Sequence, residues 1–214
     1  NFSDKHLILF GVNSVDPGMP NNKTFNSLII INNKFDILFK YDKIKLVPFG
    51  EFLPFEIFLN KIGVKKITEG YGSFSKGLES KLFLLNELKL LPLICYEIIF
   101  PELSQKQKNL IVNISEDAWF GETIGPKQHL AKVIFRSIEN NVFLIRSANK
   151  GYSTFVDNKG TIKKILKPNE TGVIELNVPL INNKEKKYKI DLIFFVLLFT
   201  CVFISTFLKK NENK

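Results

Sequence analysis

Apolar residues gather in short runs along the chain, and polar residues, glycines and prolines separate the runs. Runs of this kind are typical of β-strands. They predict strands at residues 6–10, 26–31, 35–40, 81–85, 88–94, 110–114, 142–147, 153–156, 161–166 and 172–178. Turn residues at 32–34 and 158–160 predict two hairpins. Residues 11–22 are expected to form a loop, and Pro92 is expected to begin its strand rather than lie inside it.

Helical spacing appears between some of these runs. A helix is predicted at 126–140, where apolar residues recur on one face: Leu130, Val133, Ile134 and Ile138. Pro101 is placed to open a shorter helix. Strands interleaved with helices indicate an α/β layered domain, which we assign to residues 1–183.

The C-terminal part has a different pattern. A basic linker is assigned to 184–191, an uncharged run to 192–208 and a polar tail to 209–214. The uncharged run is near the short limit for a membrane span, and a buried core helix is the alternative. Because lysines border the run on both sides, we predict a transmembrane helix at 192–208. Those lysines do not decide its orientation.

Composition adds few constraints. The chain has 214 residues, enough for one α/β domain, and a net charge of +9. The lysines are scattered and no aromatic-basic motif accompanies them, so nucleic acid is not an expected partner. The two cysteines, Cys95 and Cys201, lie in such different contexts that a disulfide is not expected. The chain begins at Asn1, close to a predicted strand, and we expect it to be a piece of a longer protein.

Cys95 is the strongest candidate for chemistry. It ends the apolar run at 88–94 and is followed by Tyr96 and Glu97, as expected for a nucleophile at a strand-to-loop elbow. The alternative is a small buried thiol that only packs. Lys43 follows another predicted strand, and an ammonium near a thiol favours the thiolate and stabilises an oxyanion. A carboxylate is also needed to move protons.

Four stretches carry these residues together. They are Tyr-Asp-Lys and Leu-Val-Pro-Phe-Gly-Glu at 41–51, Ile-Cys-Tyr-Glu and Phe-Pro at 94–101, Asp-Ala-Trp-Phe-Gly and Gly-Pro-x-Gln-His at 117–129, and Arg-x-x-Asn-x-Gly-x-Ser at 146–153. In these stretches the chain resembles the nitrilase superfamily, and within it the apolipoprotein N-acyltransferase family. The resemblance extends from about Leu7 to the C-terminus.

The resemblance implies an αββα sandwich, incomplete at its N-terminus, with a Glu-Lys-Cys triad. Cys95 would form a thioester and Lys43 would be the triad lysine. Glu51 and Glu97 match further carboxylates of the site, and Tyr96 matches a motif tyrosine. The triad glutamate is expected before Asn1, so we expect the 214 residues alone to be inactive.

Other matched positions keep two interpretations. Glu51 and Glu97 are site carboxylates or partners of nearby lysines, and Trp119 binds substrate or belongs to the core. Phe49 and Phe52 begin an apolar, proline-broken arm at 49–59, which is a lid over acyl chains or ordinary core.

His129 is expected to be structural. The chain departs from the family at Lys45, Glu116, Lys150 and Tyr152. None of these departures affects Lys43 or Cys95, the two residues matched to the triad. They therefore bear on substrate preference more than on reaction class.

By this resemblance, an acyl chain passes from a phospholipid through the Cys95 thioester to the α-amine of a lipoprotein's N-terminal diacylglyceryl cysteine. The alternatives are a soluble carbon–nitrogen hydrolase (amidase) and a non-catalytic membrane-anchored module. No cofactor and no metal are expected, and the protein is expected to be a monomer. It would lie in the bacterial inner membrane with its catalytic domain facing the periplasm.

Overall fold

The computed structural model describes residues 3–16, 23–55, 63, 73–181 and 190–212. The chain divides into two compact units, Asn1–Asn183 and Lys184–Lys214. All of the described strands belong to the first unit, and the second contains one helix.

The first unit begins with a three-stranded antiparallel sheet. Its order is β1-β2-β3, from β1 (Ile8–Asp16), β2 (Lys23–Ile31) and β3 (Ile37–Asp42). β1 pairs with β2 from Ile8 to Asp16, so the loop predicted at 11–22 is wrong for residues 11–16, and residues 17–22 lie outside the described part of the chain. The polar residues and the glycine in this stretch suggested a loop, but continuous pairing with β2 keeps the stretch extended. β1 is an edge strand, where such residues are tolerated.

A six-stranded mixed sheet follows. It contains β4 (Phe83–Leu85), β5 (Leu88–Ile94), β6 (Leu110–Glu116), β7 (Phe143–Asn149), β8 (Ser153–Val156) and β9 (Ile162–Leu166), in that order across the sheet. β5, β6 and β7 are parallel to one another. Most of their apolar residues are buried, as expected for strands covered on both faces.

Pro92 lies inside β5, so the expectation that the strand begins there is wrong. β4 pairs with β5 only at residues 88–90, and Pro92 is opposite Val112 of β6. Among the strands that the structure describes, β5 therefore has one neighbour at Pro92, a position at which a missing N–H is tolerated.

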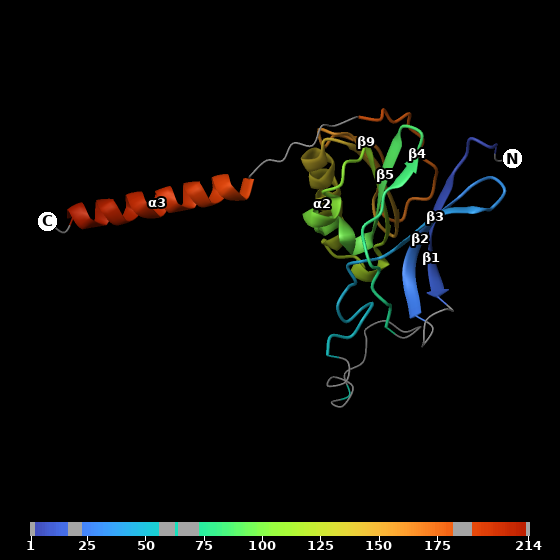
Figure 1. Ribbon diagram of the computed structural model, residues 1–214, viewed down its shortest axis with the longest axis horizontal. Coiled ribbons are helices and arrows are strands. Elements are labelled where there is room, and N and C mark those ends of the chain that lie inside the picture. Colours follow the sequence, from blue (N-terminus) through green and yellow to red (C-terminus); the bar gives the residue numbers. More distant parts are fainter. Residues whose placement is uncertain (1–2, 17–22, 56–62, 64–72, 182–189, 213–214) are drawn as a thin grey trace. The chain divides into compact units, whose positions relative to one another are not determined.

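The helices complete the layers. η1 (Cys95–Ile99) and η2 (Pro101–Ser104) follow β5, η3 (Ala118–Phe120) follows β6, and α2 (Gly125–Asn140) leads into β7. Figure 1 shows α2 on one side of the six-stranded sheet and the three-stranded sheet on the other. One apolar core joins residues of both sheets and of α2, including Leu28, Leu93 and Val133. Among the described residues, the predicted αββα sandwich is thus present as one helical layer and two sheets.

Two predictions in this unit need correction. Ile138, predicted on one apolar face of α2, is exposed, and the buried residues of the helix include Val133, His129 and Arg136. The strand predicted at 172–178 is irregular, although Leu176 and Val178 pack against the core. Alternating apolar residues there face the core, but their backbone is not paired with any strand that the structure describes, so the alternation alone does not make a β-strand.

The second unit contains α3 (Ile190–Glu212), so the uncharged run is helical. Its side chains are described for residues 193–205, and all of them are exposed. In the part of the chain that the structure describes, the search for a helix long and apolar enough to cross a membrane finds none.

Candidate active site

The carboxyl ends of β5, β6 and β7 meet at one edge of the large sheet, because the three strands are parallel. Cys95 follows β5 directly, and Glu116 and Asn149 end β6 and β7. The Cys95 thiol donates to the Glu116 main-chain carbonyl at 3.9 Å. Parallel pairing therefore places the thiol among the loops that follow neighbouring strands.

Cys95 has an unusual backbone conformation. Its φ is +50°, in the left-handed region that non-glycine residues rarely adopt. Such a residue costs on the order of 1–3 kcal/mol and persists only where its surroundings hold it. The partly exposed thiol thus sits on a sharp elbow between β5 and η1, as the sequence predicted.

Lys43 lies just after β3 and is almost completely buried, with an exposed fraction of 1%. Its Nζ donates to both carboxylate oxygens of Glu51, at 2.8 and 2.7 Å. Asn26 Nδ2 and the Val47 N–H also donate to that carboxylate, each at 2.8 Å. A buried ammonium needs such a partner, and Glu51 is in turn fully engaged by donors.

Glu97 is completely buried and ties two chain segments together. Its carboxylate accepts from Tyr41 Oη at 2.9 Å and from the main-chain N–H groups of Ile44, Lys45 and Ile94 at 2.6, 3.2 and 2.8 Å. The first three donors flank or adjoin Lys43, and the last precedes Cys95. Glu97 therefore joins the segment that carries the lysine to the segment that carries the thiol.

Burial raises the pKa of Glu97, and its hydrogen bonds oppose that rise. Burial, followed by the neighbouring Glu97 carboxyl, also raises the pKa of Tyr41.

The aromatic candidates differ in their exposure. The Tyr96 ring packs edge-on against Phe100, with centroids 5.0 Å apart. Trp119, in η3, is 58% exposed and is not a core residue. Phe49 is 42% exposed and Phe52 is half-buried, and the part of the predicted lid at 56–59 lies outside the described residues.

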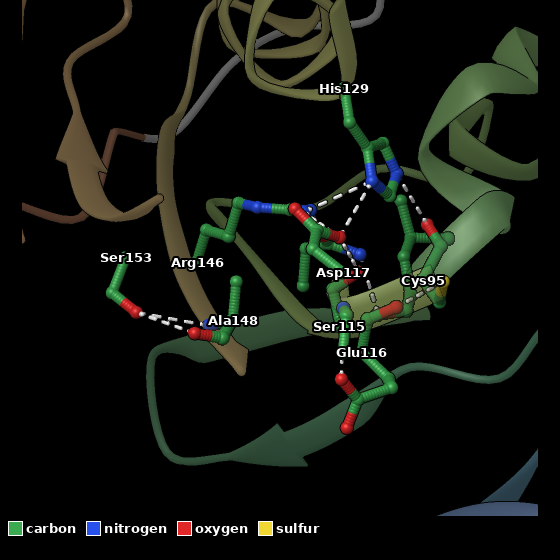
Figure 2. Close-up of polar contacts among 11 residues, drawn as sticks. Cys95, Ser115, Glu116, Asp117, His129, Arg146, Ala148 and Ser153 are labelled. Carbon is green, nitrogen blue, oxygen red and sulfur yellow. Dashed lines mark hydrogen bonds and ion pairs between the residues drawn. The ribbon is translucent and has the colours of Figure 1, made fainter. Parts of the chain in front are cut away.

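A second polar cluster, not predicted as a unit from the sequence, lies behind Cys95 (Figure 2). Arg146, on β7, donates from Nη2 to both oxygens of Asp117 at 2.8 and 2.7 Å. Ser115 donates to the same carboxylate at 2.7 Å. His129, on α2, lies between Asp117 Oδ1 at 3.0 Å and the Cys95 carbonyl oxygen at 3.2 Å.

The charge in this cluster is well compensated. Burial alone would raise the pKa of Asp117, but the hydrogen bond with His129 and the Arg146 charge lower it to about 2. Gly151 lets a loop approach closely, because a Cβ there would overlap the Asp117 carboxylate. Asp117 is therefore a fixed, buried anion.

The sequence contained a signal for this cluster, since Asp117, His129 and Arg146 all fall in the matched stretches. Spacing alone could not show that they meet, because they come from the end of β6, from α2 and from β7. His129 was expected to be structural, and its contact with the Cys95 carbonyl places it next to the candidate nucleophile.

Two departures from the family pattern have local partners. Lys45 pairs with Glu102 at 3.1 Å and lies over the Phe100 ring. Glu116 accepts from Asn149 Nδ2 at 2.7 Å and from the Ala118 N–H at 3.0 Å. Both are accommodated at the edges of the site.

Curated relatives share much of this sequence. The apolipoprotein N-acyltransferase of Rhizobium leguminosarum bv. trifolii is 40% identical over 182 residues, which are 82% of this chain and 34% of that protein. The protein of the same name from Rhodopseudomonas palustris is 40% identical over 76% of this chain and 31% of its own length. The chain thus spans about a third of the length of the curated relatives it matches.

Solved structures share the fold. Nit3 of Saccharomyces cerevisiae, a member of the nitrilase superfamily, superposes with a TM-score of 0.57 at 21% identity, over 75% of this chain and 55% of that one. An amidase from Nesterenkonia sp. AN1, with an acetamide moiety on its active-site cysteine, gives 0.53 at 18% identity, over 76% and 57%. The nitrilase-like α/β fold is therefore confirmed.

A match over most of the chain shows the family to which this protein belongs. Residues 5–188 match the carbon–nitrogen hydrolase family, and this range includes every candidate site residue described above. The match covers most of the chain, so this protein belongs to the carbon–nitrogen hydrolase family.

Proposed function

We propose that this chain is the catalytic part of an N-acyltransferase that acylates lipoproteins. The observation that carries the proposal is the strained Cys95 elbow, joined through Glu97 to the segment of buried Lys43. The relatives named apolipoprotein N-acyltransferase support the choice of reaction.

In the first half-reaction, the Cys95 thiolate attacks the carbonyl carbon of a phospholipid ester. A C–S bond forms, the ester C–O bond breaks, and the lysophospholipid leaves as an alcohol with the proton that a base has taken from the Cys95 thiol. Lys43 stabilises the oxyanion of the tetrahedral intermediate with its positive charge. Cys95 then holds the acyl group as a thioester.

In the second half-reaction, the α-amine of an N-terminal diacylglyceryl cysteine attacks the thioester. A C–N bond forms, the C–S bond breaks, and the amine proton passes to a base while the thiolate is restored. The triad glutamate implied by the resemblance is our candidate for that base.

We assign positioning roles to the two carboxylates described here. Each accepts hydrogen bonds from several donors, so neither is arranged to collect a proton from the thiol. Glu51 holds Lys43, and Glu97 holds the lysine and cysteine segments together. Tyr96 follows the nucleophile directly, and we assign its side chain to packing on Phe100 beside the elbow.

The exposed aromatic residues suit an apolar substrate. We propose that Trp119, Phe49 and Phe52 contact the acyl chains, and that the arm at 49–59 acts as a lid. Exposed aromatic rings offer the apolar surface that a lipid tail needs.

Amide hydrolysis is the second candidate, because the family match is to carbon–nitrogen hydrolases. The deciding experiment supplies the native full-length protein with phospholipid and a diacylated lipopeptide, and in parallel with simple amides. We expect triacylated lipopeptide from the first mixture and little ammonia from the second. Ammonia without triacylated product would reject the acyltransferase and favour the amidase.

We also propose that α3 anchors the protein in the bacterial inner membrane. Residues 192–208 carry no charge, and Lys209 and Lys210 follow them. Cys201 provides the test, because it lies near the middle of that run. In intact vesicles it should resist a membrane-impermeant maleimide and react once detergent is added, whereas labelling without detergent would contradict the anchor.

A further inference from the structure

The cluster behind Cys95 forms a closed circuit of hydrogen bonds. From the Cys95 carbonyl it passes through His129 to Asp117 and Arg146. Arg146 then donates to Asn113, and Asn113 Nδ2 donates to the Leu93 carbonyl at 3.0 Å. The circuit thus begins at the nucleophile and returns to β5 two residues earlier.

Burial makes this circuit rigid. Asn113, Asp117, His129 and Arg146 are all buried, and they come from β6, from the residue after it, from α2 and from β7. A buried polar group that loses its partner costs about 1–3 kcal/mol, so each member holds its neighbour in place. His129 is the member that touches the nucleophile's main chain (Figure 2).

The surroundings of His129 fix which nitrogen carries a hydrogen. A carbonyl oxygen only accepts, so the contact with the Cys95 carbonyl requires a hydrogen on Nε2. Nδ1 faces the Asp117 carboxylate, which also only accepts, so a ring that bonds both neighbours carries a hydrogen on each nitrogen. In the neutral ring with its hydrogen on Nε2, Nδ1 accepts from Arg146 Nη2, 3.1 Å away, and makes no hydrogen bond to Asp117. In both forms the Nε2–H is directed at Cys95.

Holding this carbonyl also orients the next N–H. The Cys95 carbonyl and the Tyr96 N–H belong to one planar peptide unit, in which they point in opposite directions. Tyr96 is in the first turn of η1, where an N–H has no partner within the helix. The N–H after a nucleophile is well placed to stabilise the oxyanion that forms there.

We propose that His129 is a positioning residue that fixes the peptide plane between Cys95 and Tyr96, and so aims the Tyr96 N–H at the developing oxyanion. Asp117 and Arg146 hold His129 in this orientation. The inference rests on the proposed function, since it assumes that Cys95 is acylated. It gives the histidine of the Gly-Pro-x-Gln-His stretch a role in the reaction.

The test compares two reactions of the same thiol. Alkylation of Cys95 by iodoacetamide forms a C–S bond, releases iodide and develops no oxyanion. Acylation by p-nitrophenyl acetate passes through a tetrahedral oxyanion and releases nitrophenolate. Both rates are measured in the full-length protein with Cys201→Ser, so that Cys95 is the only cysteine of this chain that reacts, and its peptide is followed by mass spectrometry.

His129→Asn should slow acylation by about 10²-fold or more, the usual cost of losing an oxyanion donor, while alkylation changes far less. His129→Gln should recover much of the acylation rate, because its longer side chain carries an N–H that reaches toward the carbonyl. His6→Asn, at the exposed second histidine, is the matched control and should change neither rate.

An equal loss in both reactions, or no loss in either, would overturn the positioning role. A failure of Gln to rescue acylation would also count against it. If unmodified Cys95 is alkylated but never acylated, the proposed function falls and this inference falls with it.

Discussion

At the residue scale, the buried charged groups of the site have different neighbours and therefore different roles. Lys43 faces one carboxylate, Glu97 faces only hydrogen-bond donors, and Asp117 faces a guanidinium. A buried charge is tolerable only when such partners compensate its lost hydration. The residues that surround each charge thus indicate what it does in the proposed reaction.

Lys43→Ala should reduce acyl transfer by about 10²–10³-fold, because it removes the positive charge that stabilises the oxyanion. Lys45→Ala is the matched control, since Lys45 is partly exposed and pairs with Glu102. Steady-state rates of the two variants, with protein folding checked by circular dichroism, give the comparison. Equal losses would mean that the lysine has been misassigned.

Asp117 should make stability depend on pH in the acid range. Its pKa falls from 3.8 to about 2 on folding, so the ionised form stabilises the fold. On the order of 2 kcal/mol is then present above pH 4 and lost as the pH falls through 2. Urea unfolding of the wild type and Asp117→Asn should therefore converge from pH 4 towards pH 2. A difference that stays constant over that range would contradict the pairing, and exposed Asp4→Asn is the control.

Part of this site could be predicted from the sequence. Lys43, Cys95, Glu51 and Glu97 stand in matched stretches, and the structure places all four at or beside the two segments that Glu97 joins. Sequence spacing could not predict where the Glu97 side chain points. Although Glu97 is two residues from Cys95, its carboxylate accepts from backbone N–H groups after β3. The cluster of Asp117, His129 and Arg146 depends on tertiary packing, which local sequence does not encode.

At the element scale, the ends of strands position the chemistry. β5 ends just before Cys95 and β3 ends just before Lys43, so each sheet leads directly into one residue of the pair. Most strands could be predicted because their apolar runs are short and bounded by turn residues. The ends of β1 and the irregular stretch at 172–178 could not, since strand pairing rather than hydrophobicity decides them.

The segment after β3 should select for long acyl chains. Phe55 is 85% exposed and Phe52 is half-buried, so polar replacement of Phe55 removes apolar contact area with little cost to folding. Phe52→Gln and Phe55→Gln should impair transfer from long-chain phospholipids more than from a short soluble acyl ester. Phe35→Gln, at a 72% exposed phenylalanine in the β2–β3 turn, is the control. Equal losses on both substrates would indicate ordinary packing.

At the scale of the whole molecule, the chain combines a nitrilase-like domain with a separate apolar helix. The part of the chain that matches its curated relatives spans about a third of their length. The proposed acyl transfer joins these observations, because a thioester enzyme that takes acyl groups from phospholipid needs both a reactive cysteine and access to lipid.

The central claim is that Cys95 carries the acyl group, and trapping that adduct tests it most directly. The full-length protein is incubated with phospholipid, digested and analysed by mass spectrometry with and without hydroxylamine. We predict an acyl mass on the peptide containing Cys95 that hydroxylamine removes, as expected for a thioester. An adduct on Cys201 instead, or none on Cys95 while triacylated product forms, would contradict the account.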